Sequence, residues 1–352
     1  MATLNELKPT SPQEQAAGKV QGRLAHVPAD LLPKEIVGPI FEKAQESSLV
    51  LRLGEAIPVS YGETVIPINT KRPEVGQVGT GTSNEQREGG VKPVSGLGWG
   101  SRSFSPIKLA TIVTTSEEFA RSNPRGLYSR IQNDLAFAIG RGIDLAVLHG
   151  KQPINGQPLQ GIEAANVLAN TTNKIYLDEP EDGKTAGGKR KALVEQVLAG
   201  YDLVADNSAN EFDGWAADTR YKGQLSRATV VRDVNGNIAD PAAVNLRAGV
   251  TELAGFPVNY GRAVAGDLGA ATDSGMRLLG GDFSQLRYGY ADQVRVKVSD
   301  TATLTSGGET ISLWQTNQIA ILIEVTFGWV VGSLDAFVRF NQTGWTAPPA
   351  GG

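Results

Sequence analysis

The chain has 352 residues, of which 40% are hydrophobic and 20% are charged, and its formal net charge is −4 at pH 7. This composition is typical of a folded soluble protein and argues against a protein that coats nucleic acid by charge alone. The sequence has no cysteine and only two histidines, His26 and His149. Disulfides, thiolate nucleophiles and cysteine metal sites are therefore excluded, and a histidine-rich metal site is nearly excluded.

Residues 1–30 are expected to form an extended arm. They are polar and lack the hydrophobic periodicity of a helix or strand. Their three basic and three acidic side chains cancel, whereas an arm that grips nucleic acid needs uncompensated cations. The arm has no long apolar run, so no secretory signal is expected. Pro33 then opens a short helix that continues toward Gly54 and is kinked or broken at Pro39.

Alternation between residues 61 and 78 predicts a strand. Val65 and Pro67 lie on one side of it, and Ile66 and Ile68 lie on the other. A strand of about 18 residues spans on the order of 60 Å at about 3.3 Å per residue. Such a strand is long for a compact domain and suits a projecting arm.

A second strand is predicted from residue 104 to 115, because Ile107, Leu109 and Val113 share one side. Between the two strands, residues 73–100 are polar and contain eight glycines. A structureless loop of this length is unusual inside a compact domain. We therefore predict a projecting β-hairpin, with a disordered insertion as the alternative. An isolated two-stranded ribbon is marginally stable in water, so another molecule is expected to hold it.

The longest predicted helix runs from Pro124 to His149. Asn123 is placed to cap its first turn, Pro124 suits the first helical position, and Gly150 supplies the stop. At about 100° per residue, one arc of the helix is predicted to hold Leu127, Ile131, Leu135, Ala138, Gly142 and Leu145. The opposite side is predicted to hold Asn133, Asp134, Arg141 and Asp144, with Arg130–Asp134 and Arg141–Asp144 spaced to pair. A helix of this length spans about 39 Å and suits a strut, although an ordinary long core helix has the same pattern.

The second half of the chain predicts a mixed sheet with at least two helices. A helical pattern covers residues 190–204, a short strand covers residues 215–217, and Asp218 can cap the helix that follows. Asn235-Gly236 is a hairpin turn signal. Further strands are predicted within residues 253–260, 280–299 and 309–340, the last of which reads as sheet rather than as a membrane span. The fold class is therefore α+β.

No catalytic, cofactor-binding or metal-binding set emerges from the sequence. The string DEPEDGKT, residues 178–185, lacks the first glycine of a phosphate-binding loop, and four carboxylates would repel the ligand. The string GLGWG, residues 96–100, lacks the glycine spacing of a dinucleotide-binding loop. His149 ends the long helix, where a cation is favoured, so its role is expected to be structural. We expect a protein that is not an enzyme.

The order of these parts resembles the major capsid protein of tailed double-stranded DNA phages, the Hong Kong 97-like fold. The resemblance covers roughly residues 31–340. The strings that carry it are SPIKLATIVTTSEEFARSN (105–123), IQNDLAFAIGRGIDLAVLHG (131–150), PLQGI (158–162), LAGFPVNY (253–260) and GDFSQLRYGYADQVRVKVS (281–299). They look like the return strand of the extended loop, the spine helix with the turn after it, and the later strands of that family.

The resemblance implies a division of the chain into five parts. The expected parts are an N-terminal arm with a short helix (1–54), an extended β-hairpin loop (55–115), a peripheral domain (116–185) with a spine helix at 124–149, an axial domain (186–330) with some strands returning to the peripheral domain, and a last peripheral strand with a loose C-terminal tail (331–352).

The resemblance also implies a function. The chain would assemble into hexamers and pentamers of an icosahedral shell that encloses double-stranded DNA without sequence-specific binding. It would be found in the virion after assembly in the host cytoplasm, and its partners would include a portal protein. The arm before Pro33 is shorter than the scaffolding segment of some family members. Scaffolding is therefore expected from a separate protein or a cleaved precursor, and the Met1 start disfavours cleavage. A decoration protein is a further possible partner.

Contacts between subunits are expected along the extended loop. Trp99 lies in its glycine-rich tip, where no core is expected. The candidate contact residues are Lys71, Arg72, Glu74, Arg87, Glu88, Lys92, Trp99 and Arg102. Some members of the family join a lysine of this loop to an asparagine of a neighbour. Lys71 and Lys92 lie in the right region, but no acidic catalyst or asparagine can be matched, so we expect no covalent cross-link.

Three alternative functions remain open from the sequence. An encapsulin-like nanocompartment shares the fold, and the long polar arm and chain length favour the phage capsid over it. A hydrolase or ligand-binding α+β protein would need a pocket with convergent polar groups, for which there is no candidate. A phage tail-tube or decoration subunit is disfavoured by the long helix.

Overall fold

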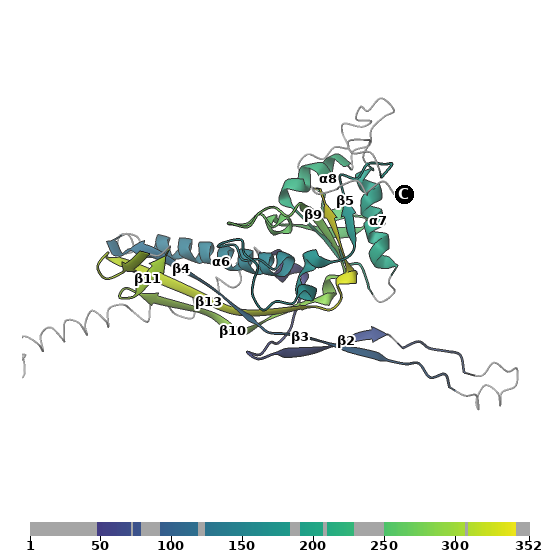
Figure 1. Cartoon of the computed structure of the whole chain (residues 1–352), viewed down its shortest axis with the longest axis horizontal. Coiled ribbons are helices and arrows are strands. Elements are labelled where there is room, and N and C mark those ends of the chain that lie inside the picture. The colour runs from purple at the N-terminus through teal and green to yellow at the C-terminus, as the bar shows by residue number, and fades with distance from the viewer. Residues whose placement is uncertain are drawn as a thin grey trace, which may run out of the picture. The chain divides into compact units, whose positions relative to one another are not determined.

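The computed structural model describes residues 48–71, 73–78, 92–118, 124–183, 191–206, 210–228, 250–306 and 309–342 (Figure 1). They belong to two compact units. The first holds the described residues within 112–135 and 294–323, and the second holds those within 44–111, 136–293 and 324–352. The predicted arm, the Asn235-Gly236 turn and the C-terminal tail lie outside the described residues. No helix in this part of the chain is long and apolar enough to cross a membrane.

The predicted long helix is confirmed as α6 (Pro124–His149). It ends at Gly150, which has the left-handed φ of 64° and donates its N–H to the carbonyl of Ala146 over 2.8 Å. A Cβ at this position would lie 3.0 Å from Val167, so both conformation and space favour glycine. The predicted N-cap, Asn123, lies outside the described residues. In the second unit, α6 buries an apolar stripe that includes Ile143.

The predicted polar side of α6 is wrong at one position, because Asp144 is buried. Its carboxylate accepts hydrogen bonds from Ser48 Oγ over 2.5 Å and from the N–H groups of Leu49 and Val50 over 3.0 Å each. These are the first residues of α3 (Leu49–Leu53), the described part of the predicted short helix. The predicted Arg141–Asp144 pair is therefore replaced by a helix cap. Burial raises the pKa of Asp144, against the hydrogen bonds from Ser48, Val50 and Leu49.

Another predicted position on α6 is also wrong, since Ala138 is exposed although it was assigned to the apolar arc. The remaining described positions follow the prediction better. Leu135, Gly142 and Leu145 are buried, and Arg141 is exposed. The difference arises because the buried stripe follows Leu135, Ala136, Ile139 and Ile143 rather than a line through Ala138.

The second unit is built around a mixed six-stranded sheet with the order β5-β14-β9-β6-β8-β7. Its strands are β5 (Lys174–Tyr176), β14 (Phe337–Asn341), β9 (Met276–Gly281), β6 (Gly214–Ala217), β8 (Phe256–Tyr260) and β7 (Glu252–Leu253). β14 runs parallel to β5 and β6 runs parallel to β8, whereas β9 is antiparallel to both β14 and β6. A mixed sheet with helices is the predicted α+β class.

Two helices, α7 (Leu193–Ala205) and α8 (Lys222–Ala228), pack with this sheet (Figure 1). The core that they share holds Val197, Trp215, Leu225 and Phe340, all buried. The sequence predicts one apolar face for the helix at residues 190–204, made of Leu193, Val194, Val197, Leu198 and Tyr201, and this prediction is only partly right. Val197 is buried, but 49% of Val194 and 46% of Leu198 are exposed. Position 200 is buried in their place because it faces Phe340.

Short 3₁₀ helices connect these elements. They are η3 (Ala164–Asn166), η4 (Leu168–Asn170), η5 (Thr219–Tyr221), η7 (Arg262–Ala265), η8 (Phe283–Gln285) and η9 (Leu334–Ala336). The predicted cap is confirmed at η5, where Asp218 accepts the N–H of Arg220 over 3.0 Å. A buried aspartate can therefore begin the turn that leads into α8.

A four-stranded sheet has the order β1-β10-β13-β4, and its three long strands have residues in both units. The strands are β1 (Glu55–Ala56), β10 (Leu286–Ser299), β13 (Gln318–Val331) and β4 (Ile107–Ser116). β1 runs parallel to β10. The first unit also contains the hairpin of β11 (Thr303–Ser306) and β12 (Glu309–Ser312). Leu313 is buried after this hairpin, and the next residue, Trp314, is 75% exposed.

The strand predicted at residues 104–115 is confirmed as β4, but its assignment as the return strand of the long hairpin is wrong. The strand that pairs with β2 (Thr64–Lys71) is β3 (Gly98–Phe104), in the segment assigned to a glycine-rich loop. The pairing of β3 with β2 ends at Phe104, two residues before Pro106, which has no N–H to donate. β4 then joins β13, and Lys108 of β4 pairs with Glu324 of β13 over 3.1 Å.

The cap by Asp144 leads to a prediction. The variant Asp144→Ala is expected to lower the free energy of unfolding by about 3 kcal/mol, because two N–H groups of α3 and the Ser48 hydroxyl lose their acceptor in a buried place. Urea denaturation of the purified protein measures this free energy. The control is Asp134→Ala on the exposed part of the same helix, expected to change stability by less than about 0.5 kcal/mol. Equal losses in both variants would contradict the assignment.

The contact at Gly200 leads to a second prediction. Replacing glycine by alanine inside a helix normally stabilises it by up to about 1 kcal/mol. At Gly200 the new Cβ would lie 2.3 Å from Phe340, so Gly200→Ala is expected to cost about 2 kcal/mol. Thermal unfolding of Gly200→Ala and of Gly223→Ala compares the two, because a Cβ at Gly223 meets no atom within 4 Å. Stabilisation by both substitutions would rule out the close contact.

Candidate subunit interface

The predicted two-stranded hairpin is present as β2 and β3 (Figure 1). The strands are antiparallel, and their register runs from Thr64 opposite Phe104 to Lys71 opposite Gly98. In the described part of the chain they pair only with each other. Beyond the strands the two arms stay adjacent, since the N–H of Glu74 donates to Ser95 Oγ over 2.7 Å.

The two faces of this hairpin differ in exposure. On one face Ile66 and Ile68 are partly covered and Phe104 is buried. The other face carries Val65, Pro67 and Trp99, of which Val65 is 60% and Trp99 is 67% exposed. We call these three residues the exposed hairpin face. An exposed tryptophan beside a valine and a proline is typical of a contact surface.

The structure places the eight predicted contact residues unevenly. Arg72, Arg87 and Glu88 lie outside the described residues, and only the backbone of Lys71 is described, at the end of β2. Glu74 and Lys92 are exposed beside the strands. Trp99 lies on the exposed hairpin face, whereas half-buried Arg102 lies on the other face, opposite Ile66. The described candidates therefore do not form one cluster. Val65 and Pro67 share the exposed side with Trp99 but were not among the candidates, although their shared side was visible in the alternation.

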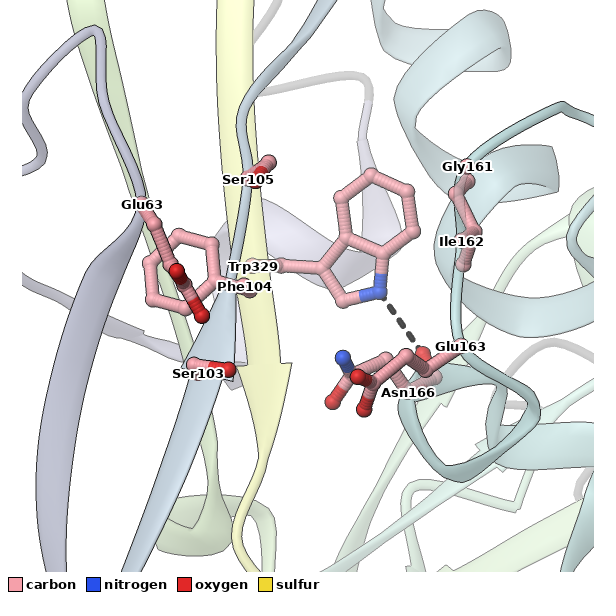
Figure 2. A pocket seen from close by; sticks show the side chains of 9 residues that line it. All are labelled: Glu63, Ser103, Phe104, Ser105, Gly161, Ile162, Glu163, Asn166 and Trp329. Atoms are coloured by element: carbon pink, nitrogen blue, oxygen red, sulfur yellow. Dashed lines mark hydrogen bonds between the residues drawn. The ribbon is translucent and has the colours of Figure 1, made fainter.

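A cavity of about 90 Å³ lies between the base of the hairpin and the loop that follows α6 (Figure 2). Its lining residues are Glu63, Ser103, Phe104, Ser105, Gly161, Ile162, Glu163, Asn166 and Trp329. We call it the base pocket. Sequence reasoning missed it, because its walls come from β3, the 161–166 loop, β13 and the residue before β2.

The walls of the base pocket are held in place by buried groups. Trp329 is 4% exposed and donates its Nε1–H to the carbonyl of Asn166 over 2.7 Å, as drawn in Figure 2. The Asn166 side-chain oxygen accepts the N–H of Val331 over 3.2 Å. Phe104 packs closely on β13, since a Cβ at Gly328 would lie 2.6 Å from its ring. The pocket is therefore a fixed feature with two aromatic walls.

Two carboxylates belong to the rim of the base pocket, and both are exposed. Glu63 lies on the hairpin side and Glu163 on the side of the loop (Figure 2). No described lysine or arginine forms an ion pair with either of them. No group of three or more metal-ligating side chains occurs among the residues that the structure describes. The arrangement can attract a cationic group, and it lacks a nucleophile paired with a base.

A cluster of charged side chains in the second unit is fully paired. The Arg220 guanidinium reaches Asp218 over 3.1 Å, Asp267 over 2.9 Å and Asp273 over 3.2 Å. Arg277 reaches Asp273 over 3.0 Å. Asp218 is completely buried, so its charge is compensated by these arginines. The network ties η5 to β9 and offers no free group for catalysis.

His149 has the structural role that was predicted, but for a different reason. Its Nε2 lies 3.1 Å from the carbonyl oxygen of Ala263 and 3.0 Å from that of Val264 in η7, so Nε2–H donates to both. Burial lowers the pKa of His149, against these two hydrogen bonds. The expectation of a cation at the helix end is therefore wrong, and the neutral ring joins α6 to η7.

A family model described as the phage capsid family matches residues 29–341 of the chain. The chain belongs to the phage capsid family. The match spans both units and the hairpin, which confirms the predicted resemblance to phage capsid proteins. It favours neither the hydrolase nor the nanocompartment alternative.

Relatives and solved structures agree with this family. The protein named "Probable major capsid protein gp17" of Mycobacterium phage L5 is 26% identical over 318 residues, 86% of each chain. Among solved structures, a chain of Gordonia phage Cozz is 30% identical, with a TM-score of 0.64. The match covers 85% of the present chain and 87% of the phage Cozz chain. A chain of Mycobacterium phage Ogopogo shares the fold, with a TM-score of 0.63 at 22% identity and coverage of 84% and 92%.

The environment of His149 leads to a pH prediction. Because the folded pKa lies below the ordinary value of about 6.5, the unfolded chain takes up this proton first, and stability is lost as pH falls through that value. Unfolding free energies of the wild type and of His149→Gln, measured between about pH 8 and about pH 5, are expected to converge toward low pH. A gap that widens toward low pH would mean that the native ring is protonated.

Proposed function

We propose that this chain is the major capsid protein of a tailed double-stranded DNA phage and that it self-assembles into the hexamers and pentamers of an icosahedral shell. The observation that carries the proposal is the family match over residues 29–341, which includes the hairpin. The similarity to the gp17 protein over 86% of both chains supports it. The role is structural, and the shell encloses DNA without sequence-specific binding.

The fold proposed for this role is the Hong Kong 97-like fold, with the five parts expected from the sequence. α6 is the spine helix of the peripheral domain, and residues 186–330 form most of the axial domain. Two features of the sheets adjust these parts. β14 pairs with β9 of the axial range and with β5, so both β5 and β14 belong to the sheet of that range. β4 pairs with β13, so we assign the extended loop to β2 and β3.

The exposed hairpin face supports contact with a neighbouring copy. Val65, Pro67 and Trp99 leave apolar surface in water, and covering a tryptophan removes about 150–250 Å² from solvent. The charged candidates would lie around this contact, where Glu74 and Lys92 are exposed. Closed symmetry repeats the same contact in every copy of the shell, so a modest contact is sufficient.

The remaining partners follow from this role. A portal protein, and separate scaffolding or decoration proteins, would meet the shell in the virion, and assembly would take place in the host cytoplasm. The net charge of −4 suits a shell that does not hold DNA by charge. No covalent cross-link between subunits is proposed, because no asparagine and acidic catalyst can be assigned to Lys71 or Lys92.

The experiment that tests this function is assembly of the purified chain. Negative-stain electron microscopy and sedimentation are expected to show shells or capsomer rings. A protein that stays monomeric at high concentration, with the hairpin covered by its own chain, would contradict the proposal. Covalent cross-links would appear as multimers that resist detergent on a denaturing gel.

A variant of the hairpin face tests the contact itself. Trp99→Ala is expected to leave the stability of the unassembled subunit unchanged, because Trp99 is 67% exposed. It is expected to raise the protein concentration needed for assembly about tenfold or more, since buried tryptophans are common anchors of interfaces. The matched control is Ile154→Ala, in a loop where the side chain is 80% exposed. Equal assembly of both variants would exclude Trp99 from the contact.

A further inference from the structure

The base pocket has no occupant in the proposed function, and its chemistry is specific. We propose that it receives a lysine or arginine side chain from a second copy of the chain. This inference rests on the proposed function, because it needs copies that adjoin each other in a shell. The carboxylates of Glu63 and Glu163 would hold the cationic end, and Trp329 and Phe104 would line the stem.

The size of the pocket favours one side chain. Sites for small organic ligands usually measure about 300–1,000 Å³, whereas this cavity measures about 90 Å³. Calcium takes about six to eight oxygen ligands, and two carboxylates on opposite sides are too few for it. Lysine and arginine carry an apolar stem and a cationic end, which match aromatic walls below two acidic groups.

The charges of the same copy do not fill the pocket. Lys108, close to the hairpin base in sequence, already pairs with Glu324. Glu63 and Glu163 form no ion pair with any lysine or arginine in the described ranges. A cationic side chain that reaches the pocket would be attracted by both carboxylates.

The position of the pocket favours a second copy as the donor. Ser103 lines the pocket and lies opposite Val65 in the register of β2 and β3, so it is on the same side of the hairpin as Val65, whereas Phe104 lines the pocket from the covered face. A neighbour that covers Val65 and Trp99 would therefore also reach the pocket. Since all copies in a closed shell are equivalent or nearly so, each pocket would meet the same kind of neighbour.

A charge-neutral double variant tests the proposal. Glu63→Gln combined with Glu163→Gln keeps the shape of the pocket and removes both charges. It is expected to leave the unassembled subunit as stable as wild type, because both side chains are exposed. It is expected to raise the concentration needed for assembly about tenfold or more, as measured by sedimentation and electron microscopy. Glu163→Lys is expected to have a larger effect, because it repels the incoming cation.

The matched control is Glu181→Gln combined with Glu195→Gln, which changes net charge equally at two exposed sites outside the pocket. If the double variant assembles as well as the control, the proposal is overturned. The same result is expected if a different protein, rather than a second copy, fills the pocket. A loss of stability in the unassembled double variant would overturn it too, because the cation would then come from the same copy. If the wild type itself forms no shells, the proposed function fails instead, so the two failures are distinguishable.

Discussion

The hairpin of β2 and β3 has only two strands, and one of its faces is partly covered while the other lies in water. The covered face has Ile66, Ile68 and buried Phe104, and the exposed face has Val65 and Trp99. A ribbon of this kind is marginal in isolation, so its order depends on what covers the second face. In the proposed shell the missing cover is another copy, which makes folding of the hairpin and assembly parts of one process.

The base of the hairpin is, in contrast, fixed by the chain itself. Phe104 packs against β13 at Gly328, and Trp329 is hydrogen-bonded to Asn166. The same unit contains the cap that Asp144 of α6 provides for α3. Buried hydrogen bonds of this kind define one arrangement of the elements they join, because any other arrangement leaves a polar group without a partner. A rigid base therefore holds a hairpin whose other face is exposed to solvent.

Local sequence signals predicted the long helix, since Pro124 and Gly150 are chemically suited to its two ends. They failed where a distant residue decides the outcome. Asp144 looked exposed because periodicity takes no account of a partner 96 residues away in sequence. β3 was hidden by its glycines, although strand pairing needs only backbone. The base pocket could not be predicted, because four separate segments build it, whereas the order of the motifs was enough to recognise the family.

The open edges of the hairpin have a consequence for the free subunit in the cell. In the described part of the chain, β2 and β3 each pair on one side only, which leaves a row of backbone groups able to accept a foreign strand. Pro67 interrupts that row, because proline has no N–H to donate. In the proposed function, a proline within the exposed ribbon thus acts against amyloid-like stacking of newly made chains before a neighbour covers the hairpin.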